Sequence, residues 1–333
     1  MKIRLAVRAL VATLCAAGCG GDGVANDLLL APPASAELGF QKAIEPFTVP
    51  PGEEIQSCYF FEVPYDTPTY FNSFVISQNT GTHHVNVFRV KTIKNLSGKP
   101  GDVVTSSASQ PGPCFVSSNW SDWPIVTNNQ GSSDPAGNQS TFALPDGVGA
   151  RFEAHELLML QVHYVNATIQ PTPGQARVAI NFMKMRDADV QAELGTVFAT
   201  NQNVRACPGD QERSYDSTCR FARSAVTIVG ANGHFHNHGV DFSMNVFDST
   251  SGKGARFYDS SAWDDPLFAK SLAVEVPADG GITFTCKYTV GPTECGNADD
   301  SCCYTFGPHV TTQEHCNAFV YYYPRNTTDV NCF

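Results

Sequence analysis

Short runs of β-branched and aromatic residues, separated by turn-forming residues, recur along most of this chain. They are found at 58–63, 70–76, 83–90, 157–165, 226–229, 240–247, 282–290 and 317–323. Asn, Gly, Pro and Asp separate the runs, and helical periodicity is scarce. Strands at such spacing are typical of β-sandwiches, and 333 residues are enough for two of them. We therefore expect an all-β chain with two tandem antiparallel β-sandwich domains.

The first 40 residues are expected to be a targeting segment rather than part of the fold. Residues 1–18 have a basic start and a short apolar stretch, which is typical of a signal peptide. Small residues precede Cys19, as in a bacterial lipoprotein cleavage box where this cysteine would carry lipid; ordinary signal cleavage is the alternative. Residues 19–40 indicate a flexible tether. We expect export to the periplasm, outer membrane, cell surface or medium, with membrane contact only through lipid on Cys19.

The charged segment at 184–189 is the expected boundary between the two sandwiches, which then span 41–185 and 186–333. A polar stretch at 100–140, rich in Gly, Ser and Asn, is expected to be mostly loop. The formal net charge is −11, and loss of the signal peptide removes three basic residues and no acidic one. Such a surface repels phosphate backbones, so a nucleic-acid partner is not expected.

Ten cysteines lie beyond the targeting segment, and an even number in an exported chain indicates a disulfide framework. They are Cys58, Cys114, Cys207, Cys219, Cys286, Cys295, Cys302, Cys303, Cys316 and Cys332. A thiolate metal site at Cys295, Cys302 and Cys303 is the competing interpretation, which an oxidising compartment disfavours.

The histidines are concentrated in a few strand-like runs. His234, His236 and His238 alternate, so in a strand they point to one face at about 6–7 Å spacing, close enough to share a metal ion. A polar strand end with solvent-facing histidines is the alternative. His83 and His84 are adjacent, and they would point to opposite faces unless one lies at a strand end or on a β-bulge.

Several motifs, taken in order, resemble the copper type II, ascorbate-dependent monooxygenases, the family of dopamine β-hydroxylase and peptidylglycine α-hydroxylating monooxygenase. The similarity covers roughly residues 45–333. The matched motifs are His83-His84-Val85 for His-His-Met, Leu160-Gln161-Val162-His163-Tyr164 for Leu-Gln-Val-His-Tyr, His234-Phe235-His236 for His-x-His, and Glu314-His315-Cys316-Asn317 for Glu-Met-Cys-Asn. An aromatic strand at 319–324 follows the last motif, as in dopamine β-hydroxylase.

The resemblance implies two copper ions per chain, one in each jelly-roll-like sandwich, facing each other across an open cleft. The first ion, which receives electrons from an external reductant such as ascorbate, would be held by His83, His84 and His163. The second, where dioxygen meets a small organic substrate, would be held by His234, His236 and His315, which are also the expected catalytic residues.

Family pairings also imply three disulfides, which are Cys58–Cys114, Cys219–Cys332 and Cys286–Cys316. They leave the partners of the other four cysteines open. Among the remaining histidines, His155 is expected at the surface, and His238 and His309 are expected to be solvated rather than to bind metal.

Departures from the family pattern shape the functional expectation. His315 stands where the family has methionine; imidazole suits Cu(II) better than a thioether does, and it also admits Zn²⁺. Asn232 stands where the amidating enzymes have an arginine that pairs with a peptide carboxylate, so a peptide substrate is not expected. Asn232 and Asn317 are the candidates for substrate contact.

The expected function is copper-dependent hydroxylation of a C–H bond of a small organic substrate. Copper storage, delivery or sensing without turnover is the first alternative, because His315 replaces the family's methionine. Zinc-dependent hydrolysis at His234, His236 and His315 is the second, because three histidines with an open position suit water activation.

Overall fold

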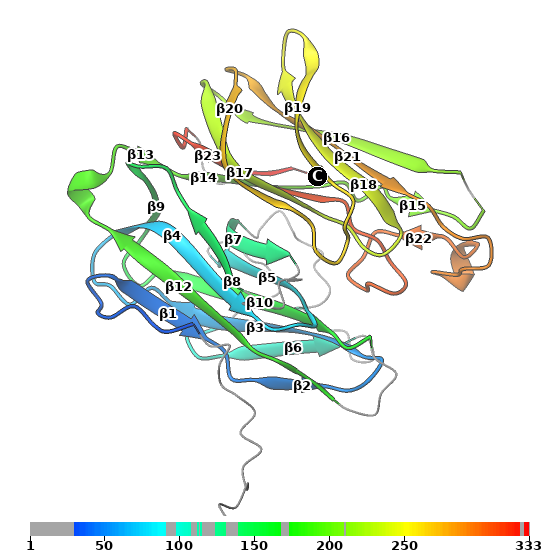
Figure 1. Cartoon of the computed structure of the whole chain (residues 1–333), viewed down its shortest axis with the longest axis horizontal. Helices are drawn as coiled ribbons and strands as arrows, with labels where there is room; N and C mark the ends of the chain where they lie inside the picture. Colours follow the sequence, from blue (N-terminus) through cyan, green and yellow to red (C-terminus); the bar gives the residue numbers. More distant parts are fainter. Residues whose placement is uncertain are drawn as a thin grey trace, which may run out of the picture.

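The computed structural model describes residues 30–90, 98–107, 112, 114, 124–130, 139–167, 173–209, 211–326 and 330–332. The proposed signal peptide, Cys19 and most of the tether lie outside these residues. Within them the chain is all-β, as predicted, and its only helical elements are the 3-10 turns Asp187–Asp189 and Ala298–Asp300. The strands form two layered units in succession along the chain (Figure 1).

The first sandwich has two main sheets. One has the order β1-β12-β4-β9-β13 with β8 also on β4, and the other has the order β6-β3-β10-β5-β7. The strands are β1 (Gly39–Ala43), β3 (Glu54–Glu62), β4 (Thr69–Gln78), β5 (Thr82–Arg89), β6 (Val103–Ser107), β7 (Ile125–Gln130), β8 (Gln139–Ala143), β9 (Val148–Phe152), β10 (Leu157–Val165), β12 (Val178–Met185) and β13 (Ala192–Glu193). A small extra sheet joins β2 (Phe47–Val49) and β11 (Gly174–Ala176).

The second sandwich has sheets of order β20-β17-β23-β14-β24 and β16-β21-β18-β19. Its strands are β14 (Gly195–Thr200), β16 (Arg213–Ala222), β17 (Val226–His234), β18 (Gly239–Asp248), β19 (Gly252–Ser260), β20 (Phe268–Val276), β21 (Gly280–Tyr288), β23 (Asn317–Tyr323) and β24 (Val330–Cys332). The short pair β15 (Arg205–Ala206) and β22 (Tyr304–Thr305) lies beside them.

The central strand β10 shows why the first sandwich forms. Its run is apolar on both faces except for Gln161 and His163, and the strand lies in the middle of its sheet, as the sequence predicted. Phenylalanine rings fill the space between the sheets, with Phe40 stacked on Phe182 at 4.5 Å and Phe71 against Phe152 at 5.2 Å. Burying one such ring contributes roughly 2 kcal/mol.

The expectation of a mostly irregular segment at 100–140 is wrong in part. Strands β6, β7 and the first residues of β8 fall within it. β6 and β7 begin with three β-branched residues each, and backbone pairing with β3 and β5 extends them into the polar residues that follow. At the expected domain boundary lies the turn Asp187–Asp189, but β13 after it still pairs with β9 of the first sandwich. The chain therefore crosses to the second sandwich at Leu194.

The two sandwiches pack against each other through a shared apolar seam. The core of the first sandwich continues into Phe198, Val229, Phe319 and Tyr321 of the second. Phe142 on β8 lies 4.8 Å from the Tyr321 ring. The Tyr321 hydroxyl donates a 2.6 Å hydrogen bond to Asn128 Oδ1 on β7. The second sandwich is thereby held directly over the β5–β7 edge of the first.

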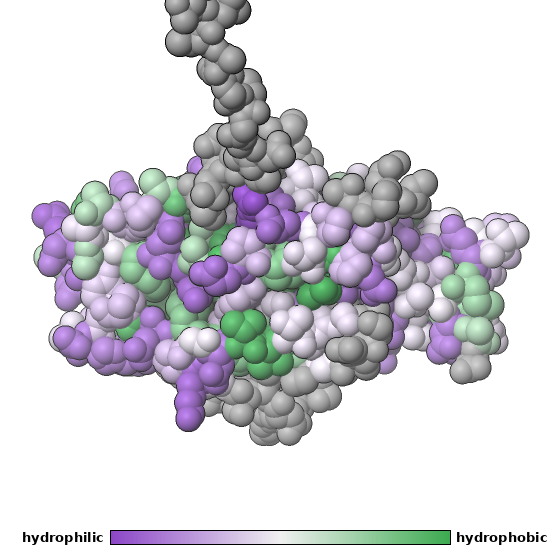
Figure 2. Space-filling view, turned by 90° about the horizontal axis from the view of Figure 1, so that it is seen from below, coloured by the Kyte–Doolittle hydropathy of each residue, from purple (hydrophilic) through white to green (hydrophobic). Residues whose placement is uncertain are grey.

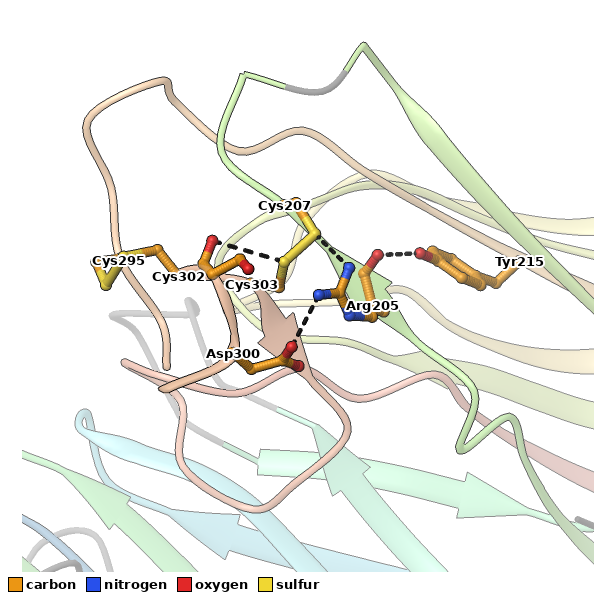
Figure 3. The surroundings of a disulfide bond; sticks show 8 residues. Arg205, Cys207, Tyr215, Cys295, Asp300, Cys302 and Cys303 are labelled. Atoms are coloured by element: carbon orange, nitrogen blue, oxygen red, sulfur yellow. Dashed lines mark hydrogen bonds and ion pairs between the residues drawn. A yellow bond between two sulfur atoms is a disulfide. The ribbon is translucent and has the colours of Figure 1, made fainter. Parts of the chain in front are cut away.

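Five disulfides tie the strands together. Three are the pairs that the family resemblance implied, Cys58–Cys114, Cys219–Cys332 and Cys286–Cys316. The other four cysteines form Cys207–Cys303 and Cys295–Cys302, which rules out the thiolate metal site. Arg205 lies beside this pair of bridges, 3.0 Å from Cys207 Sγ and 2.8 Å from Asp300 (Figure 3).

The disulfides indicate an exported protein, because such bonds persist in oxidising compartments. None of the helical segments in the described residues has the length and apolar character to span a membrane. The face seen in Figure 2, on the side of β2 and β6, is mainly polar with separate apolar patches. Of the described large apolar side chains, the exposed ones are scattered: Leu38, Val103, Val240 and Leu267.

Candidate metal centre

A β-bulge brings His83 and His84 to the same side of their sheet. His163 on β10 is paired with His84 on β5, but the next residue, Tyr164, is paired with Thr82. His83 is therefore the extra residue of the bulge, and its ring lies 5.3 Å from that of His84. The sequence prediction that one of the two needs a strand end or a bulge is confirmed.

The second group forms where two neighbouring strands of the second sandwich meet the first. His234 ends β17 and is paired with Asn317, the first residue of β23. His236 follows in the loop after β17, and His315 lies just before β23. The His315 ring is 5.3 Å from His234 and 4.4 Å from His236. The three residues of the predicted second copper site are thus in mutual contact.

All six predicted ligands form one buried cluster, which we call the histidine cluster: His83, His84, His163, His234, His236 and His315. The rings of His83 and His234, from different sandwiches, lie 4.9 Å apart, and those of His84 and His234 lie 5.3 Å apart. The side chains are 0–7% exposed. The expected open cleft between two separate sites is therefore wrong for this structure, because the sandwiches dock closely enough to bring both groups together.

Nitrogen positions define two groups able to hold a metal ion. The ligand atoms of His83, His84 and His234 lie within 4.8 Å of one another, as do those of His234, His236 and His315. His234 belongs to both groups. His163 belongs to neither, although its ring lies 5.3 Å from His83 and 5.0 Å from His84.

Several imidazole nitrogens of the cluster face one another rather than hydrogen-bond partners. Among the described residues, both nitrogens of His234 and the Nε2 atoms of His83 and His236 are buried without a hydrogen bond. Buried polar atoms in this state are costly unless something binds them. The vacant nitrogens therefore fit a metal ion, which is the partner that neutral imidazole commonly takes.

Burial keeps these imidazoles ready to bind metal. It lowers the pKa of His83, His84, His234 and His315 well below the usual histidine value, and the neighbouring imidazoles lower it further. Burial also lowers the pKa of His236, although Glu314 opposes the shift. A neutral ring has a free nitrogen lone pair, so metal ions do not compete with protons there at neutral pH.

Two buried carboxylates position the histidines, a role that the sequence analysis assigned to neither of them, although Glu314 belongs to the matched Glu314-His315-Cys316-Asn317 motif. Glu54 Oε2 lies 3.0 Å from His163 Nε2 and accepts the Val310 N–H at 3.3 Å, so it joins β3 to a loop of the second sandwich. Burial alone would raise the pKa of Glu54, but hydrogen bonds from His163 and His309 hold it well below the usual glutamate value. Because the carboxylate is ionised, His163 donates the proton in this contact.

Glu314 organises the loop that carries His236. Its two oxygens accept the backbone N–H groups of His236 and His238, each at 2.9 Å. His236 Nδ1 lies 2.9 Å from the Gln313 carbonyl oxygen, which only accepts, so the proton sits on Nδ1 and Nε2 is left for a ligand. No local sequence pattern reports the role of Glu54, which acts on residues far from it along the chain. Glu314 stands in the matched motif, but its partners His236 and His238 lie 78 and 76 residues away, so its role is not readable there either.

Several other sequence predictions are placed by the structure. His238 is not solvated as expected: it is buried, its Nδ1 lies 3.1 Å from Glu314, and its ring lies 3.9 Å from Tyr304. It does not share a face with His234, because β17 ends at His234. His309 is partly buried beside Glu54, 3.5 Å from its Oε1. His155 is half-exposed at the surface, as expected.

The two candidates for substrate contact are buried. Asn232 accepts a 3.3 Å hydrogen bond from Asn128 across the seam between the sandwiches. Asn317 is 1% exposed and lies opposite His234 in the sheet. In this arrangement both residues are part of the buried structure around the cluster.

Comparison with known proteins assigns no family. No protein-family model and no curated protein match the chain. Among solved structures, that of infectious bursal disease virus Gx strain matches at a TM-score of 0.18 with 10% identity, covering 90% of this chain and 76% of that one. The tandem CBM22 domains of Paenibacillus barcinonensis Xyn10C match at a TM-score of 0.18 with 11% identity, covering 83% and 82%. TM-scores this low establish no relationship and assign no function.

Proposed function

We propose that this chain is an exported, copper-dependent monooxygenase-like protein that hydroxylates a C–H bond of a small organic substrate with dioxygen and an external one-electron reductant such as ascorbate. The observation that carries the proposal is the histidine cluster, in which imidazoles from both sandwiches are buried together with vacant nitrogens. The ordered motifs that resemble the copper monooxygenases supply the reaction class. Copper, when bound, would supply the one-electron redox chemistry.

The donor set fits two copper ions. His83, His84 and His163 would hold the first, and His234, His236 and His315 the second. Imidazole suits copper and zinc alike, but His315 in place of a thioether favours Cu(II) over Cu(I). We therefore expect a lower reduction potential at the second group than a methionine ligand would give.

A surface cavity of about 640 Å³ offers an approach for a small polar substrate. Residues of both sandwiches line it, including Gln130 and Ser140 of the first and Lys270 of the second. Gln130 is paired with His84 across β5 and β7, so this wall of the cavity is backbone-bonded to the cluster. The volume of the cavity is in the range of small-molecule sites, although no histidine of the cluster lines it.

Copper storage, delivery or sensing without turnover is the second candidate function. Burial favours it, because the side chains of all six histidines are covered when the sandwiches are docked. A storage protein needs only the metal to enter, whereas an oxygenase needs dioxygen and substrate at the same place.

The finer location of the protein is also a proposal. The disulfides require an oxidising compartment, and Cys19 after small residues favours a lipid-anchored protein in the periplasm, outer membrane or cell surface. Mass spectrometry of the protein from its membrane fraction would detect or exclude lipid on Cys19.

Metal analysis and oxygen uptake test the proposed function together. We expect two copper ions per chain and ascorbate-dependent oxygen consumption that forms a hydroxylated product. His236→Ala should keep the first ion and lose the second, together with the oxygen consumption. His315→Met should alter turnover, with His155→Met as the surface control. Two copper ions without oxygen uptake on any candidate substrate would establish storage instead, and one zinc ion would point to a hydrolase.

A further inference from the structure

The nitrogen positions do not group the ligands into one set for each sandwich, as the family resemblance implies. They define a set that contains residues of both sandwiches. His83 and His84, on the bulge of β5, have their ligand atoms within 4.8 Å of His234, which ends β17 of the other sandwich. Nitrogens around a tetrahedral ion lie about 3.3 Å apart, given metal–nitrogen distances of about 2.0–2.1 Å. The nitrogens of each pair therefore have to approach by at most about 1.5 Å when an ion binds.

His163 competes poorly for the same position. Ring distances do not separate it from His234, because both rings lie about equally close to His83 and His84. The nitrogens do: His163 Nε2 is engaged by the ionised Glu54 at 3.0 Å, whereas both nitrogens of His234 are buried without a hydrogen bond. His234 therefore gains more from binding a metal ion than His163 does.

We propose that His234 is the third ligand of the metal ion held by His83 and His84, so that this ion binds residues of both sandwiches at once. The ion then acts as a clamp across the seam, and His163 with Glu54 supports the site from outside. The inference deepens the proposed function, on whose copper binding it rests, by assigning one ligand to a different ion.

The clamp has a consequence for the second group. His234 also belongs to the set with His236 and His315, so the two positions are not independent. Loading of one position therefore changes the affinity of the other, which two sites separated by an open cleft would not do.

Variants in a single-site background decide which residue is the third ligand. The background carries His236→Ala and His315→Ala, which removes the second group and leaves His83, His84, His163 and His234. Cu²⁺ alone is titrated against a chromophoric chelator, and electron paramagnetic resonance reports the number of coordinated nitrogens. His234→Asn and His163→Asn are then compared in this background, with His155→Asn as the surface control.

We expect the background protein to bind one Cu²⁺. His234→Asn should weaken binding by about tenfold or more and remove one coordinated nitrogen, whereas His163→Asn should change the affinity less than His234→Asn. A larger loss for His163→Asn, with His234→Asn unchanged, overturns the proposal and restores one ligand set per sandwich. A background protein that binds no Cu²⁺ also overturns it, because three of the stated ligands are then insufficient.

Hydrogen exchange supplies a second measurement if an asparagine variant does not fold. One equivalent of Cu²⁺ added to the background protein should protect the backbone amides of both β5 and β17, because the clamp joins them. Protection confined to β5 and β10 refutes the clamp. If the wild-type protein binds no copper, the proposed function fails as well; if it binds two ions and only the variant comparison reverses, this inference alone fails.

Discussion

The carboxylate of Glu54 is the contact between the sandwiches whose removal is easiest to quantify. It accepts hydrogen bonds from His163 Nε2 at 3.0 Å and from the Val310 N–H at 3.3 Å, and both go to the same oxygen. Glu54→Gln keeps the shape and one acceptor oxygen, so both bonds persist with a neutral acceptor. A bond to a charged group contributes about 1.5–3 kcal/mol and a neutral one about 0.5–1.5, so each bond loses about 1 kcal/mol.

We therefore expect Glu54→Gln to lower the free energy of unfolding of the metal-free protein by about 2 kcal/mol at neutral pH. Urea unfolding with the disulfides intact measures it. Glu62→Gln is the matched control, because Glu62 lies on the same strand β3 but its side chain is 46% exposed. Exposed carboxylates of this kind contribute little, and the control should change stability by less than about 0.5 kcal/mol.

The effect of Glu54→Gln on stability should also depend on pH. The pKa of Glu54 is held below its usual value in the folded protein, against the effect of burial, by the hydrogen bonds from His163 and His309. Its contribution is therefore complete above the unfolded glutamate pKa of about 4.3 and is lost as pH falls towards the folded value. The difference between wild type and Glu54→Gln should be constant from pH 7 to pH 5 and shrink below pH 4. A Glu54→Gln protein as stable as the Glu62→Gln control at neutral pH would refute the role assigned to this carboxylate.

Three further predictions concern the cluster and the disulfides. Burial lowers the pKa of His83, His84 and His234 in the folded protein, so below about pH 6.5 the unfolded chain binds more protons than the folded one. The free energy of unfolding of the metal-free protein should therefore fall by up to about 1.4 kcal/mol per pH unit for each ring. A flat profile in urea unfolding between pH 6.5 and 5 would contradict this. Glu314→Gln leaves one neutral acceptor oxygen for two backbone N–H groups, so it should lower the free energy of unfolding by about 2 kcal/mol in thermal unfolding. It should also weaken binding of the copper ion near His236, measured by chelator competition. Unchanged copper affinity would show that other contacts position the loop. A disulfide that closes a longer loop restricts the unfolded chain more. Replacing Cys207–Cys303, with a sequence separation of 96, by serines should therefore lower the free energy of unfolding by about 4.7 kcal/mol, against about 2.5 kcal/mol for Cys295–Cys302, with a separation of 7. Equal losses in the two paired serine variants would refute this reasoning.

Local patterns were sufficient to predict the strands and part of the site. The apolar run of β10 identifies a central strand, and adjacent His83 and His84 require the bulge that the structure contains. The family resemblance added what spacing does not contain, above all three disulfide pairings and the grouping of His315 with His234 and His236.

The rest depends on how the sandwiches dock, and docking leaves no local pattern in the sequence. Glu54 contacts His163 and Val310, which lie 109 and 256 residues away along the chain. The six histidines come together because the β5–β7 edge packs against the second sandwich. The alternation of side chains along single strands does not predict this packing. Strands β6 and β7 are not predicted because only their first three residues are β-branched, and the polar residues that complete them become strand through pairing with β3 and β5.

The aromatic contacts of Phe142 with Tyr321 and Phe268 have a practical consequence for anyone who wishes to produce half of this protein. Cutting the chain at Leu194 would expose these rings to water on both fragments at once. Each fragment would have an exposed hydrophobic patch, and such patches promote self-association. The two sandwiches are therefore better produced together, and each is better studied by substitution than by truncation.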